Sequence, residues 1–276
     1  RFSRDWSSDV CSSDLGTAGG NHNYHASSVV NVTLLNAYKG IGVNAPPYEK
    51  SVHELSRVDN VKGTALYQGL DARNCADVGT WRSITFSNHY WAAAPAAYNP
   101  PPRSALDAWT RANGTAFTLA DVEWDSFYDI SAEDYQVGIR FVPGERISFA
   151  GQFAWAQITD CDVAVHADAN SIDARSPNWG ASFLRSVLEG SVAAVRNNAV
   201  GHIHIADSTL AGGIGGWSAR RVSVTSPGAS PAAYTGIGAP PKPTRAVLYD
   251  VSQAPYHART TSGAAPTDDA DAVDAS

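Results

Sequence analysis

Three stretches in the middle of the chain, residues 135–142, 146–157 and 161–168, alternate hydrophobic and polar positions. This period of two is expected of strands that bury one face. Turn signals such as Pro-Gly separate the stretches at a spacing of about ten residues, which is typical of antiparallel sandwiches and jelly rolls. We therefore expect residues 16–172 to form a mainly β domain, an antiparallel β-sandwich or jelly-roll-like fold.

Shorter patterns predict elements elsewhere in this domain. Residues 28–37 are rich in β-branched residues and residues 80–91 alternate, so both are expected to be strands. Residues 98–103 (YNPPPR) contain three consecutive prolines, which fit neither a helix interior nor a strand interior and predict a linker or long loop. A short helix is expected over residues 104–113, with Ser104 as its N-cap.

The hydrophobic spacing changes to three and four over residues 179–197, which predicts a helix. Residues 200–206 then form a short apolar strand before a glycine-rich loop. We therefore expect a domain boundary near residues 173–180 and the start of a small, incomplete α/β segment over residues 178–260. The Asp- and Ala-rich residues 261–276 are expected to be a disordered acidic tail.

Composition narrows the function classes. The chain has 276 residues, 43% of them hydrophobic, and a net charge of -7 that is concentrated near its two ends. A body with so little net charge does not favour a nucleic-acid partner, and no apolar run is long enough to predict a membrane span. Eight Trp and eleven Tyr are many for this length. They suit an extracellular or virion-associated protein that binds sugars or partner subunits, although core packing is the commoner use of such residues.

Residues 1–15 (RFSRDWSSDVCSSDL) have no hydrophobic period and resemble a translated sequencing adapter, so we expect them to be an artefactual, non-native segment. Without Cys11 two cysteines remain, Cys75 and Cys161. Their number permits one disulfide, and two separate buried thiols are the alternative. Neither lies in a spacing typical of zinc ligands.

The run over residues 201–221 (GHIHIADSTLAGGIGGWSARR) places Ala206-Asp207-Ser208 at the end of the expected apolar strand. A loop of small residues follows, and then a Gly-Trp-Ser-Ala-Arg segment. Together with the expected helix before the strand, residues 179–221 resemble the first sequence block of SGNH (GDSL-type) hydrolases.

The resemblance implies that Ser208 is the catalytic nucleophile of a serine esterase and that Asp207 shapes the turn. It further implies ester substrates on carbohydrate, such as O-acetyl groups, and no cofactor. The later Asn-Asp and Asp-x-x-His blocks of the family are absent, with Asp250 and His257 as the nearest substitute, so the resemblance implies an incomplete domain. The alternative is a plain strand-ending turn, in which Asp or Ser side chains bond the nearby backbone.

Two further groups of residues carry candidate chemistry. His202 and His204 share one face of the expected strand, an arrangement that suits a metal site or an ordinary polar face. Five acidic residues gather around a tryptophan, and two carboxylates there would suit a glycosidase-like pair, with a solvated loop as the alternative. These five are Glu123, Asp125, Asp129, Glu133 and Asp134.

The sequence thus supports two hypotheses of function. The first is a fragment of an SGNH-like serine esterase with a β-rich accessory domain. The second is a non-enzymatic phage-tail, virion or cell-surface module that binds glycans or a partner subunit through Trp and Tyr. Both imply a carbohydrate or ester ligand and no nucleic-acid or membrane partner, and neither requires a metal.

Overall fold

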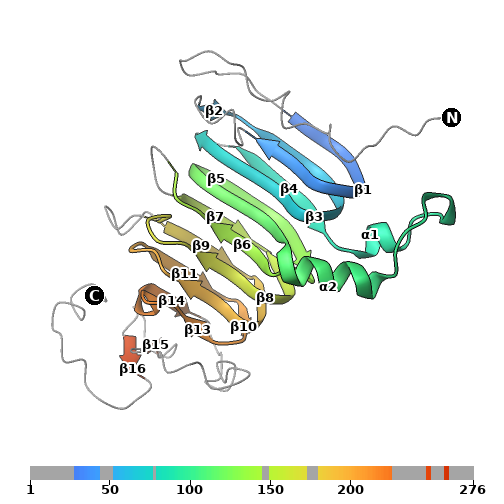
Figure 1. Cartoon of the computed structure of the whole chain (residues 1–276). Helices are drawn as coiled ribbons and strands as arrows, with labels where there is room; N and C mark the ends of the chain where they lie inside the picture. The colour runs from blue at the N-terminus through green and yellow to red at the C-terminus, as the bar shows by residue number, and fades with distance from the viewer. Residues whose placement is uncertain are drawn as a thin grey trace.

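The computed structural model describes residues 28–43, 52–76, 79–144, 149–172, 180–225, 247–249 and 258–260. Fourteen of the described strands form one sheet that winds along the chain as a β-solenoid (Figure 1). Every strand pairing in this sheet is parallel. A separate antiparallel pair joins β15 (Val247–Tyr249) and β16 (Ala258–Thr260).

Each strand is part of one coil of the solenoid. The longest strands continue around a corner, so that they pair with other strands on two faces. The strands are β1 (Ser28–Val43), β2 (His53–Glu54), β3 (Arg57–Ala76), β4 (Thr80–Phe86), β5 (Thr115–Glu133), β6 (Val137–Phe141), β7 (Ala150–Ala154), β8 (Gln157–Ala167), β9 (Gly180–Leu184), β10 (Val187–Asn197), β11 (His202–Ala206), β12 (Thr209–Ala211), β13 (Ile214–Gly215) and β14 (Val222–Thr225).

A column of aromatic rings fills the inside of the solenoid. Trp81, Phe127, Phe153 and Phe183 occupy matching positions on consecutive coils, and each is at most 1% exposed. Neighbouring rings stack with centroid distances of 5.4, 4.8 and 4.6 Å. Stacked rings of this kind add attraction beyond the area they bury, so the column favours in-register coils.

One corner of the solenoid is made by residues in the left-handed conformation. Seven non-glycine residues, one from each of seven consecutive coils, have φ angles between 48° and 60° there. Such angles cost an ordinary side chain free energy, so the surrounding sheet must hold them in place. The seven residues are Asn31, Asn60, Ser83, Asp129, Trp155, Arg185 and Asp207.

A helical insertion interrupts one coil between β4 and β5. It contains α1 (His89–Ala92), the 3-10 turn η1 (Ala96–Tyr98) and α2 (Arg103–Asn113), which lie beside the sheet in Figure 1. Buried Asn88 donates hydrogen bonds to Asp107 and Thr110 of α2, at 2.9 and 2.8 Å. The Thr110 hydroxyl in turn donates to the carbonyl of Asp134, at 2.6 Å, and so fixes α2 to the solenoid.

The expected antiparallel sandwich or jelly roll is wrong, because the sheet is parallel throughout the solenoid. The predicted strands exist, but consecutive strands belong to one coil and pair with the next coil. Phe127, Phe153, Phe183 and Ile205 are register partners in turn, separated by 26, 30 and 22 residues. The turn signals thus mark corners and loops of a coil, where hairpins had been expected.

The expected α/β segment is also wrong, because the helix expected over residues 179–197 is the two strands β9 and β10. These strands pair with β7 and β8, so the same sheet continues across the expected boundary at residues 173–180. The left-handed corner residue Arg185 puts two outward positions, Leu184 and Arg185, side by side. That break shifts the period of two and produces the spacing of three and four that imitates a helix.

The helix expected over residues 104–113 is confirmed as α2, although its N-cap is Pro102, with no side-chain cap, and not Ser104. Cys75 and Cys161 are both free thiols in the core. The expected artefactual segment 1–15 and disordered tail 261–276 lie outside the described residues.

We expect the aromatic column to carry much of the stability. Truncating Phe153 to Ala leaves a cavity between two stacked rings and should lower the free energy of unfolding by about 3–5 kcal/mol, measured by urea denaturation. The control is Gln152→Ala on the same strand, whose exposed side chain should matter by no more than about 0.5 kcal/mol. Equal effects of the two substitutions would contradict the role given to the column.

The buried thiols should be unreactive in the native protein. Burial raises the pKa of Cys161 to about 12 and raises that of Cys75 as well. In a Cys11→Ser variant we expect no reaction with a thiol reagent until guanidinium is added, and then two reactive thiols. Prompt labelling of the native variant, or no thiols after unfolding, would contradict this placement.

Candidate functional site

A cleft opens where the helical insertion lies over the outer surface of β4, β5 and β8, and we call it the insertion cleft. Its volume is about 290 Å³. Side chains from both the insertion and the sheet line it, and most of them are polar. They are Thr85, Phe86, Ser87, His89, Tyr90, Arg103, Ser131, Ala132, Glu133, Gln157 and Thr159.

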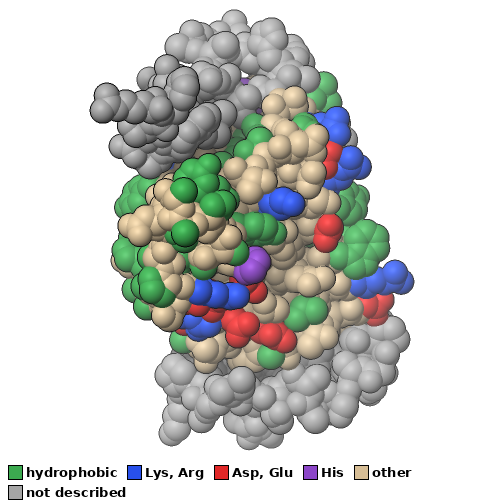
Figure 2. All heavy atoms as spheres, turned by 90° about the vertical axis from the view of Figure 1, so that its right-hand side faces the viewer, with side chains coloured by type: hydrophobic (Ala, Val, Ile, Leu, Met, Phe, Trp, Pro, Cys, Tyr) green, Lys and Arg blue, Asp and Glu red, His purple; other side chains and the backbone are tan. Residues whose placement is uncertain are grey.

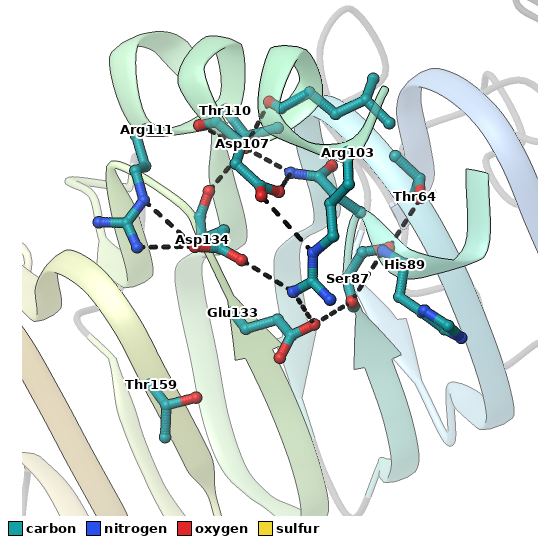
Figure 3. A network of polar contacts seen from close by, with 12 residues as sticks. Thr64, Ser87, His89, Arg103, Asp107, Thr110, Arg111, Glu133, Asp134 and Thr159 are labelled. Carbon is teal, nitrogen blue, oxygen red and sulfur yellow. Dashed lines mark hydrogen bonds and ion pairs between the residues drawn. The ribbon is translucent and has the colours of Figure 1, made fainter. Parts of the chain in front are cut away.

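Glu133 is one of the side chains that line this cleft, and Figure 3 shows its polar contacts. Its Oε1 atom accepts hydrogen bonds from the Ser87 hydroxyl and from Nη2 of Arg103, the latter at 2.9 Å. Its other oxygen carries no marked contact and points away from both donors, on the side where Thr159 lies. The carboxylate is therefore held by one oxygen and presents the other to the cleft.

Arg103 is fixed by three carboxylates. Its Nη2 atom also contacts Asp134 at 3.1 Å, and its Nε atom lies 3.5 Å from Asp107. The hydrogen bond to Asp134, followed by the charges of Glu133 and Asp107, raises the pKa of Arg103. Asp134 is further held by Arg111 at 2.6 Å. This network orients the guanidinium group beside Glu133, and the insertion and the sheet each supply part of it.

Tyr90 forms an aromatic wall of the cleft. Burial raises the pKa of its hydroxyl, and the neighbouring charge of Glu133 raises it further. Thr85 also lines the cleft, and its hydroxyl accepts a hydrogen bond from Ser131 at 3.0 Å. Because its pKa is raised, Tyr90 is neutral at physiological pH and offers a ring together with an uncharged hydroxyl.

A second hollow, of about 480 Å³, lies on the adjacent face over β7, β9 and β11, and we call it the aromatic groove. Tyr128 and Trp155 line it, and their side chains are 38% and 51% exposed. Four polar side chains at matching positions on successive coils run along it, Gln152, Ser182, His204 and Ser223, and Ser126 continues this row one coil earlier, outside the groove. Gln152 donates to Ser126 at 2.8 Å, and His204 lies 2.6 Å from the Ser223 hydroxyl.

The five acidic residues do not share one site. All but Asp134 lie on strand β5, whereas a solvated loop had been the alternative for this segment. Asp125 is buried and accepts hydrogen bonds from Trp81 and the Gly79 backbone. Asp129 accepts from Ser83 at the left-handed corner. Of the five carboxylates only Glu133 lines the insertion cleft.

Ser208 lies just after the left-handed corner, at the turn from β11 to β12. Its hydroxyl donates to the carbonyl of Ala206 at 2.7 Å and accepts from the backbone N–H of Ser186 at 2.9 Å. Ser186 makes the same pair of contacts one coil earlier, donating to Leu184 at 3.1 Å and accepting from Ala156 at 3.2 Å. The two serines thus repeat one corner motif, which is the role that the turn alternative predicts.

His202 and His204 do share one face of β11, and their rings stack at 5.7 Å. His202 lies 3.3 Å from Arg221. Across the part of the chain that the structure describes, no three His, Cys, Asp or Glu side chains gather closely enough to hold a metal ion. Asp250 and His257 lie outside the described residues.

The surface seen in Figure 2 carries acidic and basic side chains next to one another, below a group of hydrophobic side chains. Such a mixed surface suits ligands that offer both donors and acceptors better than it suits a polyanion. No helix among the described residues has the length and hydrophobicity needed to span a membrane.

Comparison with family models, with curated proteins and with solved structures finds no match to this chain. The similarity to SGNH hydrolases therefore stays a prediction from residues 179–221.

Sequence reasoning singled out Glu133 but missed its partners. Arg103 belongs to a segment that was expected to be a linker or long loop, Tyr90 belongs to an expected strand, and Thr159 lies one coil away. The signal available was weak: polar residues at alternate strand positions, such as Ser131 and Glu133, mark an outward face without naming its ligand.

The role of Ser208 can be tested with a serine-directed fluorophosphonate. Because its hydroxyl is engaged on both sides by backbone, we expect no more labelling of the wild type than of Ser208→Ala. The variant leaves the N–H of buried Ser186 unpaired and should lose roughly 1–3 kcal/mol of stability. Labelling that disappears in Ser208→Ala would instead support the esterase hypothesis.

Proposed function

We propose that this chain is a carbohydrate-binding β-solenoid module and that the insertion cleft is where it binds a sugar. This is the binding-module alternative of the two hypotheses drawn from the sequence. The observation that carries the proposal is the pairing of Glu133 and Arg103 at the cleft, which places a carboxylate acceptor beside guanidinium donors.

A sugar presents neighbouring hydroxyl groups, each of which can donate and accept a hydrogen bond. One hydroxyl would donate to the Glu133 oxygen that faces the cleft, and the next would accept from Arg103. Hydrogen bonds to charged groups are stronger than those between neutral groups, and both groups are already oriented by Ser87 and Asp134. The ligand therefore meets a preorganised site.

The remaining lining fits the same ligand class. Gln157 and Thr159 add an amide and a hydroxyl from the next coil, and Tyr90 adds a ring against which the apolar face of a sugar can pack. A few placed polar groups around an aromatic wall are the usual composition of small-ligand sites.

Binding without hydrolysis is the simpler function for this cleft. Glycoside hydrolysis ordinarily uses two carboxyl groups that flank the bond to be cleaved. Among the residues that the structure describes, Glu133 is the only carboxylate that lines the cleft, and its neighbour Asp134 forms ion pairs with Arg103 and Arg111.

The test is a glycan array followed by calorimetry with the best-binding sugar. Glu133→Gln keeps the shape of the side chain and removes its charge, so we expect affinity to fall at least tenfold, which is about 1.4 kcal/mol. The control is Glu123→Gln, the same substitution on the same strand, which should bind as the wild type does. Absence of binding to any glycan, or equal loss in both variants, would overturn the proposal.

A further inference from the structure

We propose that the aromatic groove continues the insertion cleft, so that the module binds several consecutive units of one carbohydrate polymer around a corner of the solenoid. Trp155 stands between the two parts and contacts the chain of sugars on the groove side. The inference rests on the proposed function, because it takes the sugar in the cleft as one end of a longer ligand.

The two hollows adjoin on the same coil. The corner residue Trp155 lines the groove and Gln157 lines the cleft, and only the buried Ala156 separates them. Two residues of extended chain span about 7 Å. On the coil before, Tyr128 of the groove and Ser131 of the cleft are three residues apart. A ligand leaving the cleft across this corner therefore reaches the groove at once.

The groove offers a polymer the two contacts that sugars need. Its row of hydroxyl, amide and imidazole groups repeats with the strand spacing of about 4.8 Å, so successive units meet successive polar side chains. Trp155 and Tyr128, both exposed, supply ring surface at one side of that row. An isolated apolar face would lack the polar row, and a purely polar surface would lack the rings.

The left-handed corner explains why Trp155 stands outward. Trp155 directly follows β7 with φ at 57°, and its large side chain is half exposed while Ala154 and Ala156 on either side are buried. A bulky aromatic residue in this conformation costs stability that a smaller residue would not cost. Trp124 has a similar φ of 60° and is 64% exposed, so what distinguishes Trp155 is its place beside Tyr128 and the polar row of the groove.

The experiment is a calorimetric titration with oligosaccharides of one to six units, made from the sugar that binds best on the array. In the wild type we expect affinity to rise at least tenfold between the shortest and the longest ligand. Trp155→Ala should abolish that rise while binding the shortest ligand within twofold of the wild type. Trp124→Ala, which removes an exposed tryptophan outside both hollows, should behave as the wild type.

The outcomes separate the two proposals. Affinity that is independent of length in the wild type, with Glu133→Gln still impaired, would overturn the shared track and leave the sugar site in the cleft. A rise with length that survives in Trp155→Ala would also overturn the track. If no sugar binds the wild type, the proposed function fails and this inference fails with it.

Discussion

The in-register stacking of inward side chains from one coil to the next is the constraint on which the rest of this molecule depends. Trp81, Phe127, Phe153 and Phe183 fill the interior only if each lies directly over its neighbour, as the centroid distances show. Once the inward positions are aligned, the outward positions of the same strands are aligned as well. The alignment of the left-handed corner residues, the polar row of the groove and the sheet residues that line the cleft are all consequences of it.

Some of the strands were predictable from the sequence, but β3 was not predicted, β9 and β10 had been expected to be a helix, and the pairing of the strands was not predictable. Alternation identified β6, β7 and β8 because it reports that one face of a strand is buried, but it carries no information about the partner. The repeat that would have indicated a solenoid is concealed by unequal coils. Register partners lie 22 residues apart from Phe183 to Ile205 and 46 apart from Trp81 to Phe127, where the insertion intervenes.

The site was predictable only in fragments, for the same reason. Glu133 attracted notice as one of several acidic residues, yet its setting depends on Arg103, which is 30 residues away in sequence, and on the coil that carries Thr159. Ser208 shows the opposite difficulty. Ala206-Asp207-Ser208 resembled the Gly-Asp-Ser signature of a hydrolase family, while the structure repeats the contacts of Ser208 at Ser186, where no such resemblance exists.

The helical insertion does not interrupt the stacking of the coils that form the scaffold. Trp81 and Phe127 remain register partners although α1, η1 and α2 lie between them, so the scaffold tolerates a long excursion at this point. The entropy of closing such a loop grows only with the logarithm of its length. The sequence and length of residues 87–114 can therefore change without displacing the stacked coils, and under the proposed function such changes would alter the roof of the cleft and the sugar that it accepts.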